Sequence, residues 1–281
     1  MSRSVTGIGT GGRRPAAGGS DRAPIRSRLW PPVAIFYLVT LLAAGVLQLV
    51  AAWTGFDPQA WSLPQFAPAI AVGVVLWIFP SLRGLVAATF TGRRAGFLRQ
   101  LGLVAGTTAL VFAGYIGIYA GLGQRLAVLP LHDLTAPLLI IVPLAFIGAC
   151  GEELGWRCLL QPLLRRRYST IVASSLVGLL WAVWHVPVFT QGVSIVSAFV
   201  IGAVAMSVIM GLAIERGGGH NLLVAATLHA LDNLGTLFLA GDDASGDATA
   251  SWASALVWAL AATAWVLVDR RTHRRQIAEP R

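Results

Sequence analysis

The chain has 281 residues, of which 56% are hydrophobic and only 12% are charged, and its mean hydropathy is +0.71. An average soluble domain carries roughly 25% charged residues, so this composition excludes an ordinary soluble domain and indicates a membrane protein. All 21 cations are arginine and they outnumber the 12 acids, which gives a formal net charge of +9. These arginines gather in short segments between apolar runs, as topology signals do, and we therefore expect no nucleic-acid partner.

The first 29 residues are rich in Gly, Ser, Pro and Arg. They are too polar and too long to open a cleavable signal peptide, and their composition predicts a disordered basic tail in the cytoplasm. The apolar run that follows then serves as an uncleaved anchor. We expect a transmembrane helical domain over residues 30–268 and a second basic cytoplasmic tail over residues 269–281.

A helix needs about 20 apolar residues to cross a bilayer, and eight segments approach this length. They cover residues 30–53, 66–90, 101–122, 136–164, 171–189, 193–214, 221–240 and 252–268. We therefore expect an all-α polytopic membrane bundle of about eight transmembrane helices with a central polar cavity. The second segment carries Pro80 and Arg83 near its end. An alternative for this segment is a span that stops at Phe79 and continues as an interfacial piece.

Arginine is enriched in the cytoplasmic loops of membrane proteins. With eight spans, the arginine-rich segments all fall on one side of the membrane; they are residues 1–29, 83–99, 165–167, 216 and 270–275. The opposite connections, such as 54–65 and the acidic stretch 241–251, contain almost no cations. We therefore expect a multi-pass protein of the inner (plasma) membrane, in contact with the lipid bilayer and with both termini in the cytoplasm.

A charged side chain in hydrocarbon costs at least about 2.5 kcal/mol, so each one within a span is a candidate functional residue. Ionisable groups are rare in the predicted spans and concentrate in three of them. The fourth span carries Glu152, Glu153 and Arg157, the fifth carries His185, and the seventh carries His229 and Asp232, with Asn233 beside them.

These residues lie at similar depths. At 1.5 Å per residue, Glu152 and His185 lie about 20 Å from the arginine-side ends of their spans, and His229 lies about 14 Å from its own. Each is therefore near the middle of a hydrocarbon core about 30 Å thick. We expect them to face one another and not the lipid.

Their spacing along each helix adds geometry. Residues three or four apart share a helix face, so Arg157 can partly neutralise the acidic pair, and His229 and Asn233 project together. Two adjacent carboxylates point about 100° apart, so we expect one to be chemical and the other structural. Gly151 and Gly155, which flank the acids, allow a local helix irregularity that admits water or a peptide.

A carboxylate and a histidine in a wet pocket can take a proton from water, and a second histidine with an asparagine can stabilise an oxyanion. Glu152, His185, His229 and Asn233 are therefore suited to the hydrolysis of an acyl bond. The first three can instead ligate a divalent metal such as zinc, which also activates water. The chain lacks the H-E-x-x-H spacing, so a reaction without a cofactor and a zinc-dependent reaction both stay open.

Three motifs occur in order: Glu152-Glu153-x-x-x-Arg157, Trp181-x-x-x-His185 and His229-x-x-x-Asn233. Together they resemble the motifs of the CPBP family of intramembrane proteases. That family contains the CAAX endopeptidases, which process prenylated proteins, and bacterial relatives often labelled abortive-infection or bacteriocin-immunity proteins. The resemblance covers roughly residues 136–240, the motif-bearing core of the predicted domain, while the rest matches only as apolar spans.

The resemblance implies a role for each residue. Glu152 activates water with help from His185, while His229 and Asn233 hold the oxyanion. The supporting residues that organise the site are Glu153 and Arg157. Members of the family are now usually regarded as glutamate-dependent, although metal participation was long assumed. One departure is Trp181, where the commoner residue is phenylalanine.

We therefore predict a hydrolase, an intramembrane endopeptidase that cuts membrane-associated proteins or peptides arriving from the membrane or its cytoplasmic face. A non-catalytic or regulatory protein of the same scaffold, acting in bacteriocin immunity or maturation, is the alternative. A proton-coupled transporter would use the same ionisable residues as a relay, but transporters commonly show internal repeats and the acidic pair occurs once. The arginine-only, Ala- and Gly-rich composition is typical of GC-rich bacteria, in which protein prenylation is not expected.

Overall fold

The computed structural model describes residues 29–55, 57, 61–92, 94–126, 128–240 and 247–278, and within these ranges it contains helices and no strands. The helices are α1 Trp30–Thr54, α2 Ala67–Ile78, α3 Arg83–Ala87, α4 Arg94–Gly121, α5 Leu138–Gly155, α6 Gln161–Arg165, α7 Thr170–Trp184, α8 Val193–Gly217, α9 Asn221–Ala240 and α10 Ala248–Ala278. Short 3-10 turns cover Leu63–Phe66 (η2), Pro80–Leu82, Ala88–Phe90, Leu131–Asp133 and Val186–Thr190 (η7), and a π-helical turn covers Trp156–Leu160 (η6). The all-α bundle predicted from the sequence is confirmed.

The number of spans differs from the predicted eight. Within the described ranges, six helices or continuous helical stretches are long and apolar enough to cross a membrane, and a bent pair of helices makes up to seven. Each predicted segment corresponds to a helix or a helix pair, but α7 has only 15 residues. Such a helix is about 22 Å long, shorter than a hydrocarbon core of about 30 Å.

The bent pair is the segment that carries Pro80. The stretches Leu63–Ile78 and Pro80–Phe90 meet at an angle of 116°. Phe79 leaves the helical conformation, with φ −121° and ψ 72°, because the residue before a proline is pushed out of the α region. A single straight span over 66–90 is therefore wrong, and the alternative that ends at Phe79 describes the first half of the pair.

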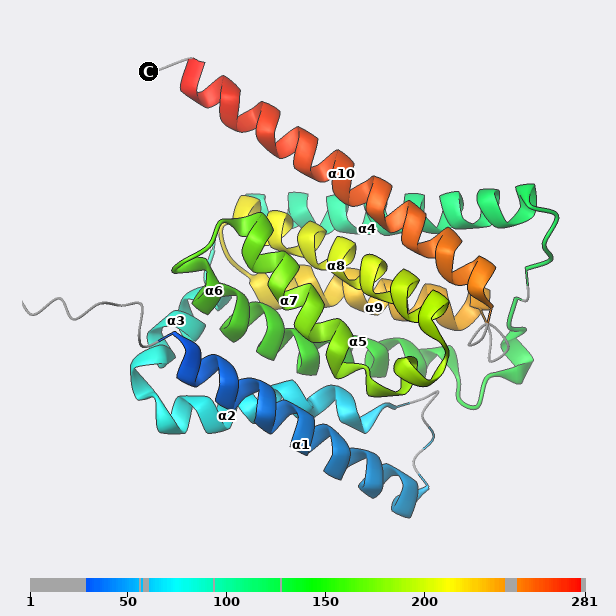
Figure 1. The fold of residues 1–281 in the computed structure, drawn as a ribbon, viewed down its shortest axis with the longest axis horizontal. Helices are drawn as coiled ribbons and strands as arrows, with labels where there is room; N and C mark the ends of the chain where they lie inside the picture. Colours follow the sequence, from blue (N-terminus) through cyan, green and yellow to red (C-terminus); the bar gives the residue numbers. More distant parts are fainter. Residues whose placement is uncertain are drawn as a thin grey trace, which may run out of the picture.

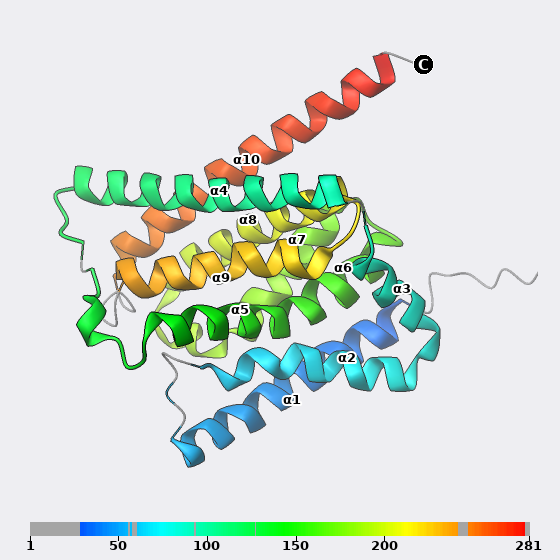
Figure 2. The same cartoon turned by 180° about the vertical axis from the view of Figure 1, so that it is seen from behind.

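The two ends of the bundle differ in charge. One end, which we call the arginine end, carries the described arginines 83, 94, 99, 165, 166, 167, 216, 270, 271 and 274. The opposite end holds the ends of α1, α4 and α9, the starts of α5, α8 and α10, and the turn η7, and Figures 1 and 2 show the two ends of the bundle on opposite sides. Arg125 is the one described arginine at the opposite end. Of the two predicted tails, residues 1–28 and 279–281 lie outside the described residues, while α10 continues to Ala278.

Small residues set the distance between helices at the core. Helix α5 packs between α2 and α9, and α8 packs against α7 and α10. At Gly178 on α7, an added Cβ atom would lie 2.8 Å from Ser207 Cβ and 2.8 Å from Val204 Cα on α8. Glycine therefore allows α7 and α8 to approach closely, as small residues do in membrane bundles.

This packing predicts the effect of Gly178→Ala. The methyl group cannot be accommodated without moving the backbone of α8, so we expect a loss of about 1–3 kcal/mol of unfolding free energy, measured by reversible unfolding in detergent. The matched control is Gly106→Ala on α4, where an added Cβ would meet nothing within 4 Å. Equal stability of the two variants would contradict the close-packing role.

Candidate active site

The acidic pair lies in the last turn of α5, where this helix passes into the π-helical turn η6. Glu152, Glu153 and Arg157 are all buried, with relative exposures of 2%, 0% and 0%. The helix irregularity expected near the acids is therefore present as the π turn, a feature often found at functional sites.

Gly151 and Gly155, which flank the acids, lie where α5 packs closely against a neighbouring segment. An added Cβ at Gly151 would lie 2.9 Å from the carbonyl oxygen of Gln65, and one at Gly155 would lie 2.5 Å from Pro68 Cβ. They permit α5 to lie directly against the segment formed by η2 and α2. This close approach brings the side chain of Gln65 to Glu152.

Glu152 is held by hydrogen bonds from two other helical segments. The indole Nε1 of Trp181 on α7 donates to Oε2 at 2.8 Å, and the amide Nε2 of Gln65 in η2 donates to Oε1 at 3.2 Å. Nε2 of His229 on α9 lies 3.9 Å from Oε1. Three segments distant in sequence therefore converge on one carboxylate.

Glu153 is directed to different partners, as the 100° step between adjacent residues requires. Its Oε1 accepts a hydrogen bond from Nδ1 of His229 at 2.8 Å, and its Oε2 lies 3.1 Å from Nε of Arg157. His229 thus connects the two acids, with Nδ1 at Glu153 and Nε2 facing Glu152. The two carboxylates therefore have different partners, and the expected division into one structural and one chemical carboxylate stays a prediction.

His185 lies just past the end of α7, where the backbone leaves the helix at φ −76° and ψ 59°. Its Nδ1 is 2.8 Å from the carbonyl oxygen of Trp181. A carbonyl oxygen can only accept, so Nδ1 carries the hydrogen and Nε2 of the neutral ring is left as an acceptor. The ring packs edge-on against Trp181, Trp184 and Phe199.

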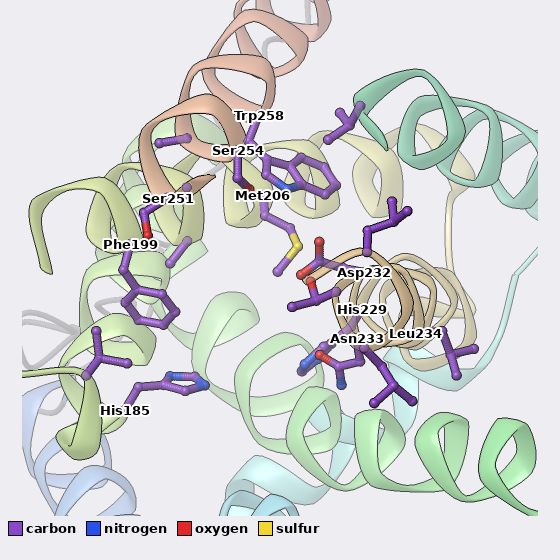
Figure 3. Close-up of a pocket in the computed structure, with 18 of the residues that line it drawn as sticks. His185, Phe199, Met206, His229, Asp232, Asn233, Leu234, Ser251, Ser254 and Trp258 are labelled. Carbon is purple, nitrogen blue, oxygen red and sulfur yellow. The ribbon is translucent and has the colours of Figure 1, made fainter. Parts of the chain in front are cut away.

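A cavity of about 570 Å³ adjoins this cluster. His185, His229, Asn233 and Asp232 lie on its wall (Figure 3), among apolar side chains such as Phe199 and Met206. Glu152 is not one of the wall residues, but its partners Gln65, Trp181 and His229 are. The base expected from the sequence therefore lies behind the cavity wall, next to three of the residues that line it.

The predicted site residues are thus brought together, but His185 is connected to the acidic pair only indirectly. Glu152, Glu153, Arg157 and His229 form a continuous chain of polar contacts. His185 joins them through Trp181, which donates to Glu152 from its side chain and accepts from His185 at its backbone.

Three side chains extend the site beyond the predicted set. Gln65 and Trp181 donate to Glu152, and Asp232 shares the cavity wall with Trp258 (Figure 3). Nothing in the sequence near Gln65 identifies it, since it is a neutral residue at the edge of a predicted span. The sequence identifies Trp181 as the aromatic member of its motif, but it does not predict the hydrogen bond to Glu152.

The donor set does not form a metal site as it is placed. Among the described residues, no group of three or more His, Cys, Asp or Glu side chains could hold a metal ion. Both oxygens of Glu152 accept hydrogen bonds from protein donors, and Nδ1 of His229 is taken by Glu153. The zinc set Glu152, His185 and His229 considered from the sequence does not fit this arrangement.

Comparison with known proteins finds a family model that is similar to the part of the chain that carries the site. Residues 134–235 match the family model described as type II CAAX prenyl endopeptidase Rce1-like. The chain is therefore similar to the Rce1-like family over about a third of its length. The matched region contains all six predicted site residues, so the resemblance to the CAAX-protease family noted in the sequence is confirmed.

The curated relatives of the chain share less than a quarter of its residues in the aligned regions. Lysostaphin resistance protein A of Staphylococcus epidermidis is 24% identical over 239 residues, which cover 84% of this chain and 62% of the relative. The proteins of the same name from Staphylococcus haemolyticus and Staphylococcus aureus are 22% and 23% identical, covering 76% and 74% of this chain and 58% and 50% of the relatives. The chain therefore spans between half and about three-fifths of the length of these curated relatives.

The hydrogen bond from Trp181 predicts a difference between two tryptophans of α7. Trp181→Phe removes a donor to a buried carboxylate, which costs about 1.5–3 kcal/mol, whereas the indole nitrogen of Trp184 has no hydrogen-bond partner among the described residues. Unfolding in detergent should show a larger loss of stability for Trp181→Phe than for the matched control Trp184→Phe. Similar losses would mean that the bond to Glu152 contributes nothing beyond packing.

The buried pair of Arg157 and Glu153 predicts strong coupling between these residues. Arg157→Met leaves Glu153 charged without its cation, and removing one partner of a buried pair costs about 3–5 kcal/mol. The double variant Arg157→Met with Glu153→Gln should regain much of that loss, because it no longer leaves a buried charge. Additive losses in a double-mutant cycle of unfolding free energies would contradict the coupling.

Proposed function

We propose that the protein is an intramembrane endopeptidase that hydrolyses peptide bonds of membrane-associated proteins or peptides. One observation carries the proposal: His229 lies between two buried carboxylates, beside a cavity of about 570 Å³ that His185 and Asn233 also line. The Rce1-like match over 134–235 supports the same conclusion. Because the chain spans only between half and about three-fifths of its curated relatives, its substrate and activity are inferred from the site.

In this proposal Glu152 and His185 activate the attacking water. A water that displaces the Gln65 amide from Oε1 would reach Glu152 from the cavity wall. Glu152 takes one proton from this water. The other O–H of the water donates a hydrogen bond to the free Nε2 of His185, which aligns the water for attack. Trp181 positions both residues, since it bonds the carboxylate and the imidazole at the same time.

His229 and Asn233 would stabilise the oxyanion. The hydroxide adds to the carbonyl carbon of the peptide bond, and the negative charge develops on the carbonyl oxygen. Nδ1–H of His229 is engaged by Glu153, so His229 donates to the oxyanion through Nε2 only when both ring nitrogens carry a proton. Collapse of the intermediate breaks the C–N bond, and the proton held by Glu152 passes to the amine that leaves.

The arginine distribution supports an orientation with both termini in the cytoplasm of a plasma (inner) membrane. Cytoplasmic loops carry the excess of arginine in membrane proteins, and the arginine end holds all the described arginines except Arg125 and the buried Arg157. The partners in this proposal are the lipid bilayer and a protein or peptide substrate, without nucleic acid.

A second candidate is a non-catalytic member of the same scaffold. The relatives from Staphylococcus are named for lysostaphin resistance and not for proteolysis, and Glu152 lies behind the cavity wall. Both observations would suit a protein that binds a toxin, a maturation factor or a lipid-linked partner.

Mutation of the site distinguishes the two candidates. We expect Glu152→Gln, His185→Ala and His229→Ala each to lower cleavage about 10²–10⁴-fold, and Asn233→Ala to lower it about 10²–10³-fold. Cleavage is measured in detergent with a membrane-proteome peptide library and a fluorogenic prenylated CAAX peptide. The matched acidic control is Glu215→Gln, which alters an ion pair with Arg165 at the arginine end and should retain activity.

The outcomes of that experiment separate the catalytic types as well. Full activity of Glu152→Gln would refute the assigned base, and no cleavage of any probe by the folded wild-type protein would favour the non-catalytic candidate. Loss of activity on strong chelation, restored by zinc, would contradict a mechanism that uses side chains alone.

A further inference from the structure

The cavity beside the site occupies only one half of the bundle. Its wall comes from the last part of α4 and α9 and from the first part of α5, α8 and α10. All of these parts lie toward the end opposite the arginine end (Figures 1 and 2). The wall continues to Ser62, Gln191 and Ala250, which adjoin the connections at that end.

The shortness of α7 helps to explain why the cavity lies toward the end opposite the arginine end. Starting at the arginine end, α7 stops at Trp184, after about 22 Å, and the chain continues as the 3-10 turn η7. His185 and Val188, which follow the end of α7, both line the cavity. The cavity therefore lies beyond the point at which α7 ends.

Toward the arginine end the space below the site is filled. Trp156, Leu160, Ile209, Met210 and Leu228 are fully buried. None of the described residues 207–228 lines the cavity. The deepest wall residues, Trp181, Met206 and His229, form its base, and no wall residue adjoins a connection of the arginine end.

We propose that this cavity is entered from the extracytoplasmic face, so that the protease cuts a peptide segment exposed outside the cytoplasm. The inference rests on the proposed function and on the orientation given by the arginines. It replaces the approach from the cytoplasmic face expected from the sequence. Apolar wall residues such as Phe199, Met206 and Trp258 suit a segment with large apolar side chains, and the polar groups meet its backbone at the base.

The sidedness can be tested without relying on activity. Ser254 lies on the cavity wall, and Ser81 is exposed beside Arg83 at the arginine end. Each is replaced in the full chain, as Ser254→Cys and Ser81→Cys, and treated with a membrane-impermeant sulfonated maleimide in spheroplasts and in inverted vesicles. The parent chain, which contains Cys150 and Cys158, gives the background, and thermal unfolding in detergent shows that each variant is folded.

We expect Ser254→Cys to be labelled in spheroplasts and to lose that labelling in inverted vesicles, with the reverse result for Ser81→Cys. Labelling of Ser254→Cys from inverted vesicles, or from neither preparation, would overturn the proposal. If labelling is as expected but no peptide is cut in detergent, the proposed protease function fails while the extracytoplasmic opening stands.

A peptide that the detergent assay identifies as a substrate extends the test to catalysis. Linked to a sulfonated fluorophore so that it cannot cross the membrane, it should be cut by intact spheroplasts. Sealed inverted vesicles should cut it only after detergent is added. Cleavage by sealed inverted vesicles together with none by spheroplasts would refute the extracytoplasmic substrate while leaving the protease function intact.

Discussion

Charge buried within a bilayer must be balanced by the protein itself, because hydrocarbon supplies neither water nor counter-ions. Glu153 meets this demand with Arg157 on its own helix and with His229 on α9. Glu152 meets it with donors from α7 and η2. The balance requires four segments to be held in register, so the same contacts that make the acids tolerable also assemble the site.

Close helix packing makes this balance geometrically feasible. A hydrogen bond of about 3 Å between side chains on neighbouring helices requires backbones that approach closely. Glycines provide this approach on both sides of the site: Gly151 and Gly155 bring α5 to the segment of η2 and α2, and Gly178 brings α7 to α8. Apart from His185, which lies just past the end of α7, the site residues are held by helical segments, an arrangement that suits precise placement of reacting groups.

The sequence was sufficient where one physical cost dominates. Charges in apolar spans are so unfavourable that Glu152, His185 and His229 could be assigned to one cluster, and their depth along each helix indicated that they meet. The end of α7 at Trp184 and the hydrogen bond from Gln65 could not be predicted in the same way, since they depend on packing between segments distant in sequence. Pro80 did signal the bend after α2, although the span count by length remained too high.

The π turn at Trp156–Leu160 has a consequence for how this chain tolerates length changes. A π turn accommodates one residue more than the α-helix around it, and each residue of a helix turns the following ones by about 100°. Deleting a single residue there would restore a regular α-helix and leave α6 close to its present rotation relative to the acids. Loss of one residue from this turn should therefore be tolerated better than the gain of one, because only the loss leaves α6 in phase with the acids.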